Sequence, residues 1–202
     1  MRSHAAIFLC LAIPFIGCAR HPQERVFPTG QMQEGDLAFR CGRGVFSRAV
    51  TSVENEGEYS HIGMLIQENG RWMVVHAVPG EKNFPADYDR VKIEPLELFY
   101  APKRAFRGRL VHTGVSSPDA IGTLRTRALQ YVADSTRFDE HYMLEDSSTV
   151  YCTELIWRLY RSIGIDLSEG RRRYIHIFRI NGEVILPEHL LAYSRNTPYF
   201  TF

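Results

Sequence analysis

The sequence lacks the charge imbalance that would point to nucleic acid or an anionic membrane surface as a partner. Its 202 residues contain 24 Lys and Arg against 23 Asp and Glu, a formal net charge of +1. A nearly neutral chain offers no electrostatic argument for such partners, so we expect no nucleic-acid binding. With 45% hydrophobic and 23% charged residues, the composition is that of an ordinary globular domain with a sizeable core.

The chain also lacks a long apolar run. The apolar stretch 5–16 is shorter than the roughly 20 residues that a membrane-spanning helix needs. It leads into the segment 15–19 (FIGCA), which resembles a bacterial lipobox, although Phe15 stands where that pattern usually has Leu. We therefore predict a lipoprotein signal peptide over 1–18 and lipidation of Cys18. An ordinary cleaved signal peptide is the alternative.

The predicted processing site also indicates a location. Ala19, rather than Asp, follows the lipobox cysteine, which by resemblance favours the outer membrane over the inner one. We expect an exported protein that is anchored to the outer membrane by its lipid and faces the periplasm. Residues 19–33 are polar and aperiodic, so they are interpreted as a tether, and 34–202 as one domain.

Cysteine is scarce. Of four cysteines, two fall in the predicted leader, and the globular part keeps Cys41 and Cys152. Two cysteines form no disulfide framework, yet an oxidising compartment permits a bond between them. Such a bond would block Cys152 as a nucleophile. The HExxH and CxxC spacings typical of metal sites are absent too.

The clearest local structure is a hairpin. Segments 60–67 and 72–78 are rich in β-branched and aromatic residues, and the Asn-Gly pair at 69–70 is a strong turn signal. A turn centred near position 69 places His61 opposite the residue that follows His76. We therefore expect the two histidines to be neighbours.

Cys152 begins a predicted amphipathic helix that runs to about residue 162 and ends before Gly164. A thiol in the first turn feels the positive end of the helix dipole, which favours the nucleophilic thiolate. The thiol needs a base and a group that orients this base. His61 fits the base and His76 the orienting group, while N–H groups at the helix start suit a developing oxyanion.

Other interpretations of these side chains stay open. His61, His76 and Cys152 are also a conceivable three-ligand zinc site, but no local ligand spacing supports it, and we predict neither a metal nor a cofactor. Glu154 is expected to be a buried structural carboxylate. The remaining pattern predicts strands at 37–39, 91–93 and 104–112, a strand or hairpin at 174–180 with its turn at 181–182, and helices at 45–53, 120–132 and 187–193.

Three motifs, in this order, resemble the circularly permuted NlpC/P60 superfamily. They are Gly-Asp at 35–36, YSHIG at 59–63 and YCTEL at 151–155. The nearest subgroup in pattern is the YiiX/YebB-like cysteine hydrolases, in which the histidine strand precedes the cysteine helix. The resemblance covers about 34–193 and implies an α+β, papain-like fold with a small antiparallel sheet packed against helices. It implies that Cys152 is the nucleophile and His61 the base, with His76 in a place where permuted relatives often carry Glu.

These features predict a cell-envelope cysteine hydrolase that cleaves an amide or peptide bond through a Cys-His-His triad and a thioester intermediate. A peptidoglycan-derived peptide is one accessible substrate. An acyltransferase or a lipid or acyl-amide hydrolase with the same triad is the second hypothesis. A ligand-binding lipoprotein without catalytic activity is the third. The sequence does not indicate an oligomeric state.

Overall fold

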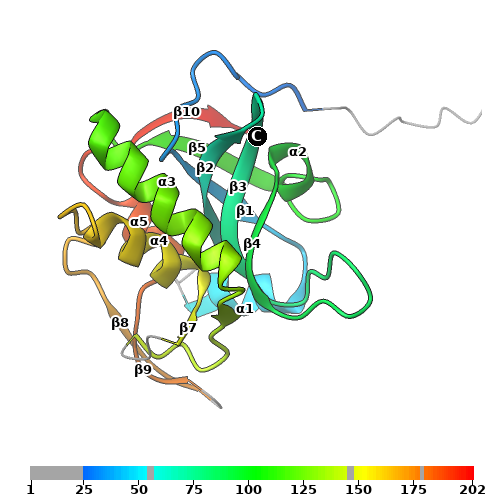
Figure 1. Cartoon of the computed structure of the whole chain (residues 1–202). Helices are drawn as coiled ribbons and strands as arrows, with labels where there is room; N and C mark the ends of the chain where they lie inside the picture. The colour runs from blue at the N-terminus through cyan, green and yellow to red at the C-terminus, as the bar shows by residue number, and fades with distance from the viewer. Residues whose placement is uncertain (1–24, 54–56, 145–147, 178–179) are drawn as a thin grey trace, which may run out of the picture.

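The computed structural model describes residues 25–53, 57–144, 148–177 and 180–202 (Figure 1). The predicted signal peptide, Cys18 and the first part of the predicted tether lie outside these residues. Within the described ranges, no helix is long and apolar enough to cross a membrane.

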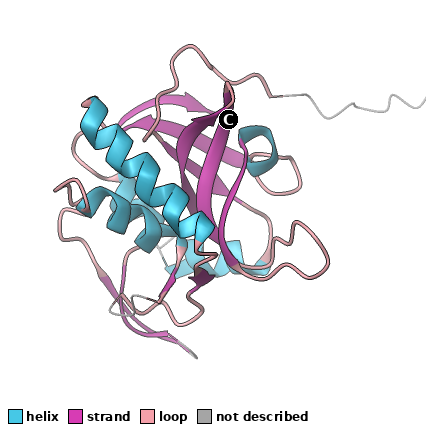
Figure 2. Cartoon of the chain, in the orientation of Figure 1, coloured by secondary structure: helices cyan, strands magenta, loops and turns pink. Residues whose placement is uncertain are grey.

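An eight-stranded sheet forms the centre of the molecule (Figure 2). Its strand order is β10-β5-β1-β2-β3-β4-β6-β7, and all neighbouring strands are antiparallel except the short pair β6 and β7. A separate antiparallel hairpin is formed by β8 and β9. The strands are β1 (Leu37–Cys41), β2 (His61–Glu68), β3 (Arg71–Val78), β4 (Arg90–Pro95), β5 (Arg107–His112), β6 (Arg137–Phe138), β7 (Thr149–Val150), β8 (Arg173–Ile177), β9 (Ile180–Val184) and β10 (Thr197–Thr201).

Helices cover both faces of this sheet. On one side α4 packs against β2 and β3, with α3 and α5 beside it, while α2 packs against β3 and β4 from the other side (Figure 1). The helices of the described residues are α1 (Val45–Val53), α2 (Leu96–Phe99), α3 (Pro118–Ala133), α4 (Cys152–Arg161) and α5 (Pro187–Leu191).

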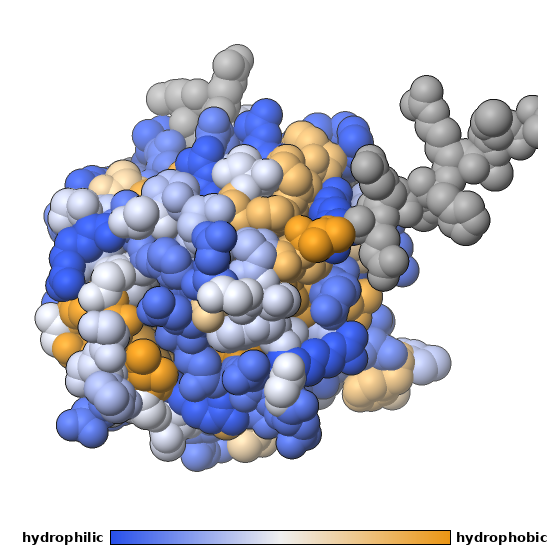
Figure 3. Space-filling view, turned by 90° about the horizontal axis from the view of Figure 1, so that it is seen from above, coloured by the Kyte–Doolittle hydropathy of each residue, from blue (hydrophilic) through white to orange (hydrophobic). Residues whose placement is uncertain are grey.

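The sheet is buried on both faces because its alternating side chains feed two hydrophobic cores. In β1, Leu37 and Phe39 join the core under α3 and α4, whereas Ala38 joins the core under α2. All five residues of β1 are therefore buried. The outer surface is mostly hydrophilic in the view of Figure 3, with hydrophobic side chains gathered in a few limited areas.

The expected α+β class, with an antiparallel sheet packed against helices, is confirmed, and the hairpin and the cysteine helix form where the pattern predicts them. One local prediction is wrong. The expected turn at 181–182 lies inside β9, where Gly182 pairs with Ile175. The apolar residues Ile175, Ile180 and Val184 pack together in a small cluster, so side-chain burial outweighs the turn preference of Asn-Gly.

Candidate active site

The hairpin of β2 and β3 brings His61 and His76 together. Nε2 of His61 lies 2.8 Å from Nδ1 of His76, a hydrogen bond between two buried rings. Phe99 of α2 packs against both rings, with centroid distances of 5.7 and 5.2 Å. The expected neighbourhood of the two histidines is therefore confirmed.

The register explains this contact and corrects the sequence-based alignment by one residue. Met64 pairs with Val75, and continuing that register places Gly63, not Ile62, opposite His76. His61 and His76 then lie diagonally on one face of the sheet, whereas the predicted alignment would have put them on opposite faces. A Cβ at Gly63 would lie 3.2 Å from Cβ of His76 and 2.3 Å from a methyl group of Val74.

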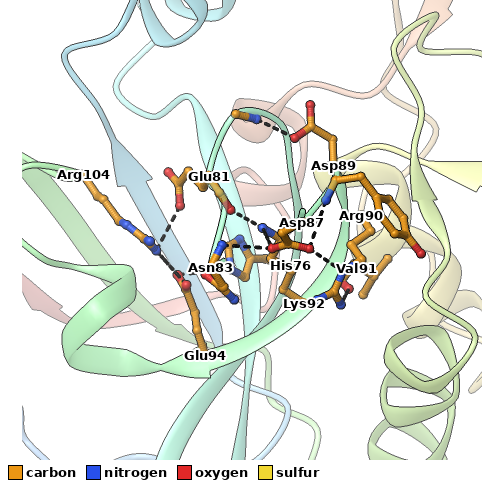
Figure 4. A network of polar contacts seen from close by, with 12 residues as sticks. His76, Glu81, Asn83, Asp87, Asp89, Arg90, Val91, Lys92, Glu94 and Arg104 are labelled. Carbon is orange, nitrogen blue, oxygen red and sulfur yellow. Dashed lines mark hydrogen bonds and ion pairs between the residues drawn. The ribbon is translucent and has the colours of Figure 1, made fainter. Parts of the chain in front are cut away.

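A carboxylate continues the chain of polar contacts from His76. Oε1 of Glu94, on β4, lies 3.2 Å from Nε2 of His76 (Figure 4). This atom of His76 has no hydrogen bond of acceptable angle among the described residues, so the contact with Glu94 is chiefly electrostatic. Nη1 of Arg104 donates to both oxygens of Glu94, at 2.8 and 2.6 Å. Glu94 is thus held between a histidine and a guanidinium.

The charges around Glu94 keep it ionised. Burial alone would favour its neutral form, but the contacts with His76 and Arg104 outweigh that effect and lower the pKa of Glu94 to about 2. An ionised carboxylate can only accept hydrogen bonds. It therefore favours the tautomer of His76 that carries its proton on Nε2, which leaves Nδ1 to accept from Nε2–H of His61.

The electrostatic environment keeps His61 neutral. Burial, followed by the nearby charge of Arg40, lowers the pKa of His61 well below 6.5. Burial also lowers the pKa of His76, although Glu94 opposes this shift. With Nε2 of His61 occupied by His76, Nδ1 is the nitrogen of His61 that remains to accept a proton.

Cys152 is the first residue of α4 and is 6% exposed. The backbone around it is firmly held. The N–H of Tyr151 donates to Glu154 at 3.3 Å, and the hydroxyl of Tyr151 accepts the N–H of Ile185 at 3.0 Å. The hydroxyl of Thr153 donates to the carbonyl of Ile185 at 2.6 Å. These contacts fix the start of the helix, where the dipole favours a thiolate.

Glu154 behaves as the structural carboxylate that the sequence predicts. It is fully buried and pairs with Arg158 one turn along α4, at 2.7 Å. Burial raises the pKa of Glu154 to about 7, although the charge of Arg158 opposes this rise. Its role in holding the N–H of Tyr151 stabilises the helix start.

An apolar pocket opens in front of Cys152. Its wall is made by α1, the β8–β9 hairpin and the start of α4, and it includes Ser60, the residue before His61. Cys152 and the residue before His61 therefore border the same hollow, although neither His61 nor His76 lines it. The catalytic pairing of Cys152 with His61 stays a prediction.

The other cysteine lies elsewhere. Cys41 ends β1, where it pairs with Arg107, and it lines a different hollow together with Arg48 and Phe106. Both Cys41 and Cys152 are thiols in the structure. The Gly-Asp motif is also separate from the histidine pair, because Asp36 contacts His112 and Tyr199 near the other end of β1.

Sequence reasoning missed Glu94 and Arg104. A signal for Glu94 was present in the alternation of Arg90, Lys92 and Glu94 along one strand. Three ionisable residues on one face of a buried strand require a polar cluster opposite them. Lys92 meets that requirement with Asp87 at 2.9 Å, and Glu94 meets it with Arg104 and His76.

A cysteine in the first turn of a helix that packs on an antiparallel sheet, with a histidine strand preceding it in the chain, defines a permuted papain-like protein. Residues 31–182 match the model of the family described as permuted papain-like amidase enzymes, YaeF/YiiX. The chain belongs to this family. The YiiX-like subgroup predicted from the motifs is thereby confirmed.

Individual relatives agree with this assignment. The chain is 25% identical over 170 residues to the protein YiiX of Escherichia coli strain K12, covering 83% of this chain and 76% of that protein. A crystal structure of YiiX from Escherichia coli O157:H7, described as a metalloprotein, superposes with a TM-score of 0.70 at 20% identity. That comparison covers 85% of this chain and 98% of the other, and it shows the shared fold.

Proposed function

We propose that this protein is a cysteine amidase in which Cys152 is the nucleophile, His61 the general base and His76 the residue that orients the base. The observation that supports this proposal most strongly is the 2.8 Å contact between Nε2 of His61 and Nδ1 of His76. It occupies one nitrogen of the buried imidazole and leaves the other to exchange a proton with a thiol.

The proposed reaction has two steps. Nδ1 of His61 takes the thiol proton while Sγ of Cys152 attacks the carbonyl carbon of the substrate. The C–N bond then breaks, the leaving nitrogen takes the proton from His61, and a thioester remains. Water next attacks the thioester and gives one proton to His61. The C–S bond breaks, the acid leaves, and the proton returns to sulfur, so one amide and one water become one acid and one amine.

Two features stabilise the charges that form in this reaction. The N–H groups at the start of α4 are the donors for the oxyanion, where one such buried donor contributes about 2.7–4 kcal/mol. Glu94 is 2% exposed and ionised, and its negative charge favours the imidazolium that His61 becomes, acting through His76. The polar chain thus extends the predicted triad by a carboxylate on the next strand.

The location belongs to the proposal as well. We infer that the chain is exported and lipidated on Cys18, so that the domain faces the periplasm and acts on a peptide or amide of the cell envelope. Labelling with radioactive palmitate should mark the wild type and not Cys18→Ser. A wild type without label would contradict the lipid anchor and leave the amidase proposal standing.

A second candidate function is an acyltransferase or an acyl-amide or lipid hydrolase. It is favoured by the apolar wall of the pocket in front of Cys152, since such a wall suits a hydrocarbon chain better than a polar peptide. Both candidates use the same thioester, and they differ in the acyl group and in whether water or another acceptor takes it.

The YiiX structure described as a metalloprotein raises the question of a metal here. The described residues contain no group of three His, Cys, Asp or Glu side chains arranged to hold a metal ion. The facing nitrogens of His61 and His76 are 2.8 Å apart, closer than two tetrahedral zinc ligands, which lie about 3.3 Å apart when each bond is about 2.0 Å. The donor set does not fit a metal, and no step of the proposed reaction runs through one.

The direct test compares two inhibitors on the purified full-length chain. Iodoacetamide should abolish amide hydrolysis and modify Cys152, whereas EDTA should leave the rate unchanged. Cys152→Ser should be inactive with intact folding, as judged by its thermal unfolding. Hydrolysis that survives in Cys152→Ser would refute the proposal.

A further inference from the structure

Ser60, the residue before the histidine strand, borders two hollows of the molecule. It lines the pocket in front of the thiol together with Cys152, and it also lines the neighbouring hollow that contains His61. Its backbone N–H donates to the carbonyl of Arg40 at 3.0 Å, which ties it to β1. Ser60 is therefore held in place between the proposed nucleophile and the proposed base.

The alternation of side chains along the chain explains which way Ser60 points. Ile62, two residues further on, belongs to the core under α3 and α4, and residues two apart in an extended chain point to the same face. His61 instead contacts Phe99 of α2, on the other face. The hydroxyl of Ser60 thus lies on the face of the sheet that carries the cysteine helix.

This hydroxyl is buried and has no hydrogen-bond partner in the part of the chain that the structure describes. Ser60 is 1% exposed, and its Oγ is among the buried polar atoms left without a bond. A buried hydroxyl that stays unpaired costs folding free energy, and such groups are rare in native proteins. The fold alone therefore does not account for a serine at this position.

Two other hydroxyls of the same pocket are already engaged. The hydroxyl of Thr153 donates to the carbonyl of Ile185 at 2.6 Å, and the hydroxyl of Tyr151 accepts the N–H of Ile185 at 3.0 Å. Both of them hold the chain around the start of α4. The proton of the Ser60 hydroxyl is not committed to any described group, so it is available to a bound ligand.

We propose that Ser60 is a further catalytic residue, whose hydroxyl donates a hydrogen bond to the oxyanion formed on the substrate. This inference rests on the proposed cysteine amidase activity and adds a residue to it. When Sγ of Cys152 attacks the carbonyl carbon, the π electrons of the C=O bond move onto the oxygen. Ser60 and the N–H groups at the start of α4 then stabilise this charge until the C–N bond breaks and the C=O bond forms again. Ser60 keeps its proton throughout.

Ser60→Ala tests this role, with 4-nitroacetanilide as the probe amide. We expect kcat to fall by at least about 10²-fold, the usual loss when one oxyanion donor is removed. KM should change by less than about threefold, because the bond is made mainly in the transition state. Alanine is smaller than serine and removes an unpaired hydroxyl, so the Tm should equal or exceed that of the wild type. A kcat within about threefold of the wild-type value overturns the proposal.

Tyr59→Phe is the matched control. The hydroxyl of Tyr59 is also buried and has no hydrogen-bond partner among the described residues, but Tyr59 lines neither of the two hollows. Its removal should change the Tm in the same direction as Ser60→Ala and should leave kcat unchanged. An equal loss of kcat in both variants overturns the donor role, because altered packing beside His61 would then explain the loss.

Binding of an aldehyde separates the donor role from the proposed hydrolysis. N-acetylglycinal adds to a thiol without a leaving group: Sγ of Cys152 bonds to the aldehyde carbon, and the thiol proton passes to the aldehyde oxygen. This oxygen then lies where the oxyanion would form. In Ser60→Ala the Kd should rise roughly three- to tenfold, the effect of one hydrogen bond. Alkylation of Cys152 by iodoacetamide, which forms no oxyanion, should keep its rate.

The possible results distinguish the two proposals. A weaker aldehyde complex in Ser60→Ala, with no amide hydrolysis by the wild type, rejects the amidase and keeps the donor. An unchanged Kd overturns the donor even if the amide is hydrolysed, and so does a wild type that binds no aldehyde. Slower alkylation of Cys152 in Ser60→Ala, measured by mass spectrometry, also overturns it, because the hydroxyl would then act on the thiol.

Discussion

The sheet carries two contacts between a histidine and a carboxylate, and they differ in the state of the carboxylate. In one, His76 lies 3.2 Å from Glu94, and Arg104 and His76 lower the pKa of Glu94 to about 2. In the other, Nδ1 of His112 lies 2.9 Å from Asp36, and burial raises the pKa of Asp36 despite that contact. A guanidinium accompanies the first carboxylate, whereas the hydroxyl of Tyr199 accompanies the second.

The geometry of the two pairs differs as well. Asp36 and His112 continue the register of β1 and β5, in which Leu37 pairs with Val111, so they face each other directly. Tyr199 stacks on His112 with a centroid distance of 4.0 Å and closes that cluster. His76 instead lies between Glu94 and His61, 3.2 Å from the first and 2.8 Å from the second. A histidine beside a carboxylate is therefore not by itself a catalytic feature. The pair of His76 and Glu94 differs from the pair of His112 and Asp36 because it contacts a further histidine, His61, that can exchange a proton.

The largest predicted effect is a loss of activity, which should follow from variants at the proposed site and not from variants at the pair of His112 and Asp36. Cys152→Ala and His61→Ala should each lower kcat/KM by about 10³-fold or more, because a triad acts as a unit. His112→Ala should stay within about twofold, since Asp36 and His112 lie near the opposite end of β1 from Arg40, the residue that pairs with His61. Amide hydrolysis by the three purified variants measures this difference. A strong loss of amide hydrolysis in His112→Ala with intact folding would show that activity does not distinguish the two histidine–carboxylate pairs.

The next effect tests whether Glu94 acts through His76. His76→Ala and Glu94→Gln should lower kcat by roughly 10- to 150-fold, the equivalent of about 1.5–3 kcal/mol. The first variant removes the hydrogen bond to His61, and the second removes the negative charge beside His76. Asp36→Asn is the matched control and should not change kcat. A merely structural role would leave the pH profile of the folded variant unmoved, whereas loss of the Glu94 charge should lower the pKa of the base. An unchanged acid limb in Glu94→Gln would contradict the positioning role.

Much of the fold and part of the site follow from local sequence signals. The alternation on both sides of an Asn-Gly turn predicts the hairpin, and the 3.6-residue period after Cys152 predicts α4. The short β6 and β7 give no such signal, because two residues cannot show an alternation, and β10 contains Pro198, which lowers the expectation of a strand.

The site, like the short strands, can be predicted only in part from local sequence signals. One residue of register decides whether His61 and His76 share a face, and turn chemistry alone does not fix that residue. Tertiary packing does, since a side chain at Gly63 would collide with Val74 and crowd His76. Glu94 escaped prediction for a related reason. Its partner Arg104 lies beyond α2, and only the folded sheet brings them together.

Acid unfolding should also distinguish the carboxylates. The pKa of Glu94 falls from 4.5 to about 2 on folding. Its contribution to stability is therefore present above pH 4.5 and is lost as the pH falls from 4.5 to about 2. At full effect it is roughly 3 kcal/mol, from about 1.36 kcal/mol per unit. Urea unfolding of wild type and Glu94→Gln should show a stability difference that shrinks across this window. A constant difference would contradict the ionised state.

The diagonal arrangement of the histidine pair should depend on Gly63. A methyl group there would lie 2.3 Å from Val74 and 3.0 Å from the backbone oxygen of Val75. We expect Gly63→Ala to destabilise the fold by about 1–3 kcal/mol, the usual cost of overpacking. Gly122→Ala is the control, because a Cβ there meets nothing within 4 Å. Equal unfolding free energies for the two variants would mean that the pair tolerates a side chain at Gly63.

The smallest predicted effect is the pH dependence of the stability cost of Asp36→Asn, which should have the opposite sign to that of Glu94→Gln. Burial raises the pKa of Asp36, although His112 and the N–H of Gln33 oppose the rise. Because folding raises the pKa of Asp36, its protonated carboxyl stabilises the folded state at low pH. This stabilisation is lost as the pH rises through the pKa of Asp36 in the folded state. Asp36→Asn should cost about 1 kcal/mol of unfolding free energy from its altered hydrogen bonds, and the cost should decrease with rising pH.

Since the cost of Glu94→Gln should increase with pH, urea titrations of both variants should give opposite slopes. Parallel slopes would show that the two carboxylates share one electrostatic state, and the contrast between the two pairs would then rest on geometry alone.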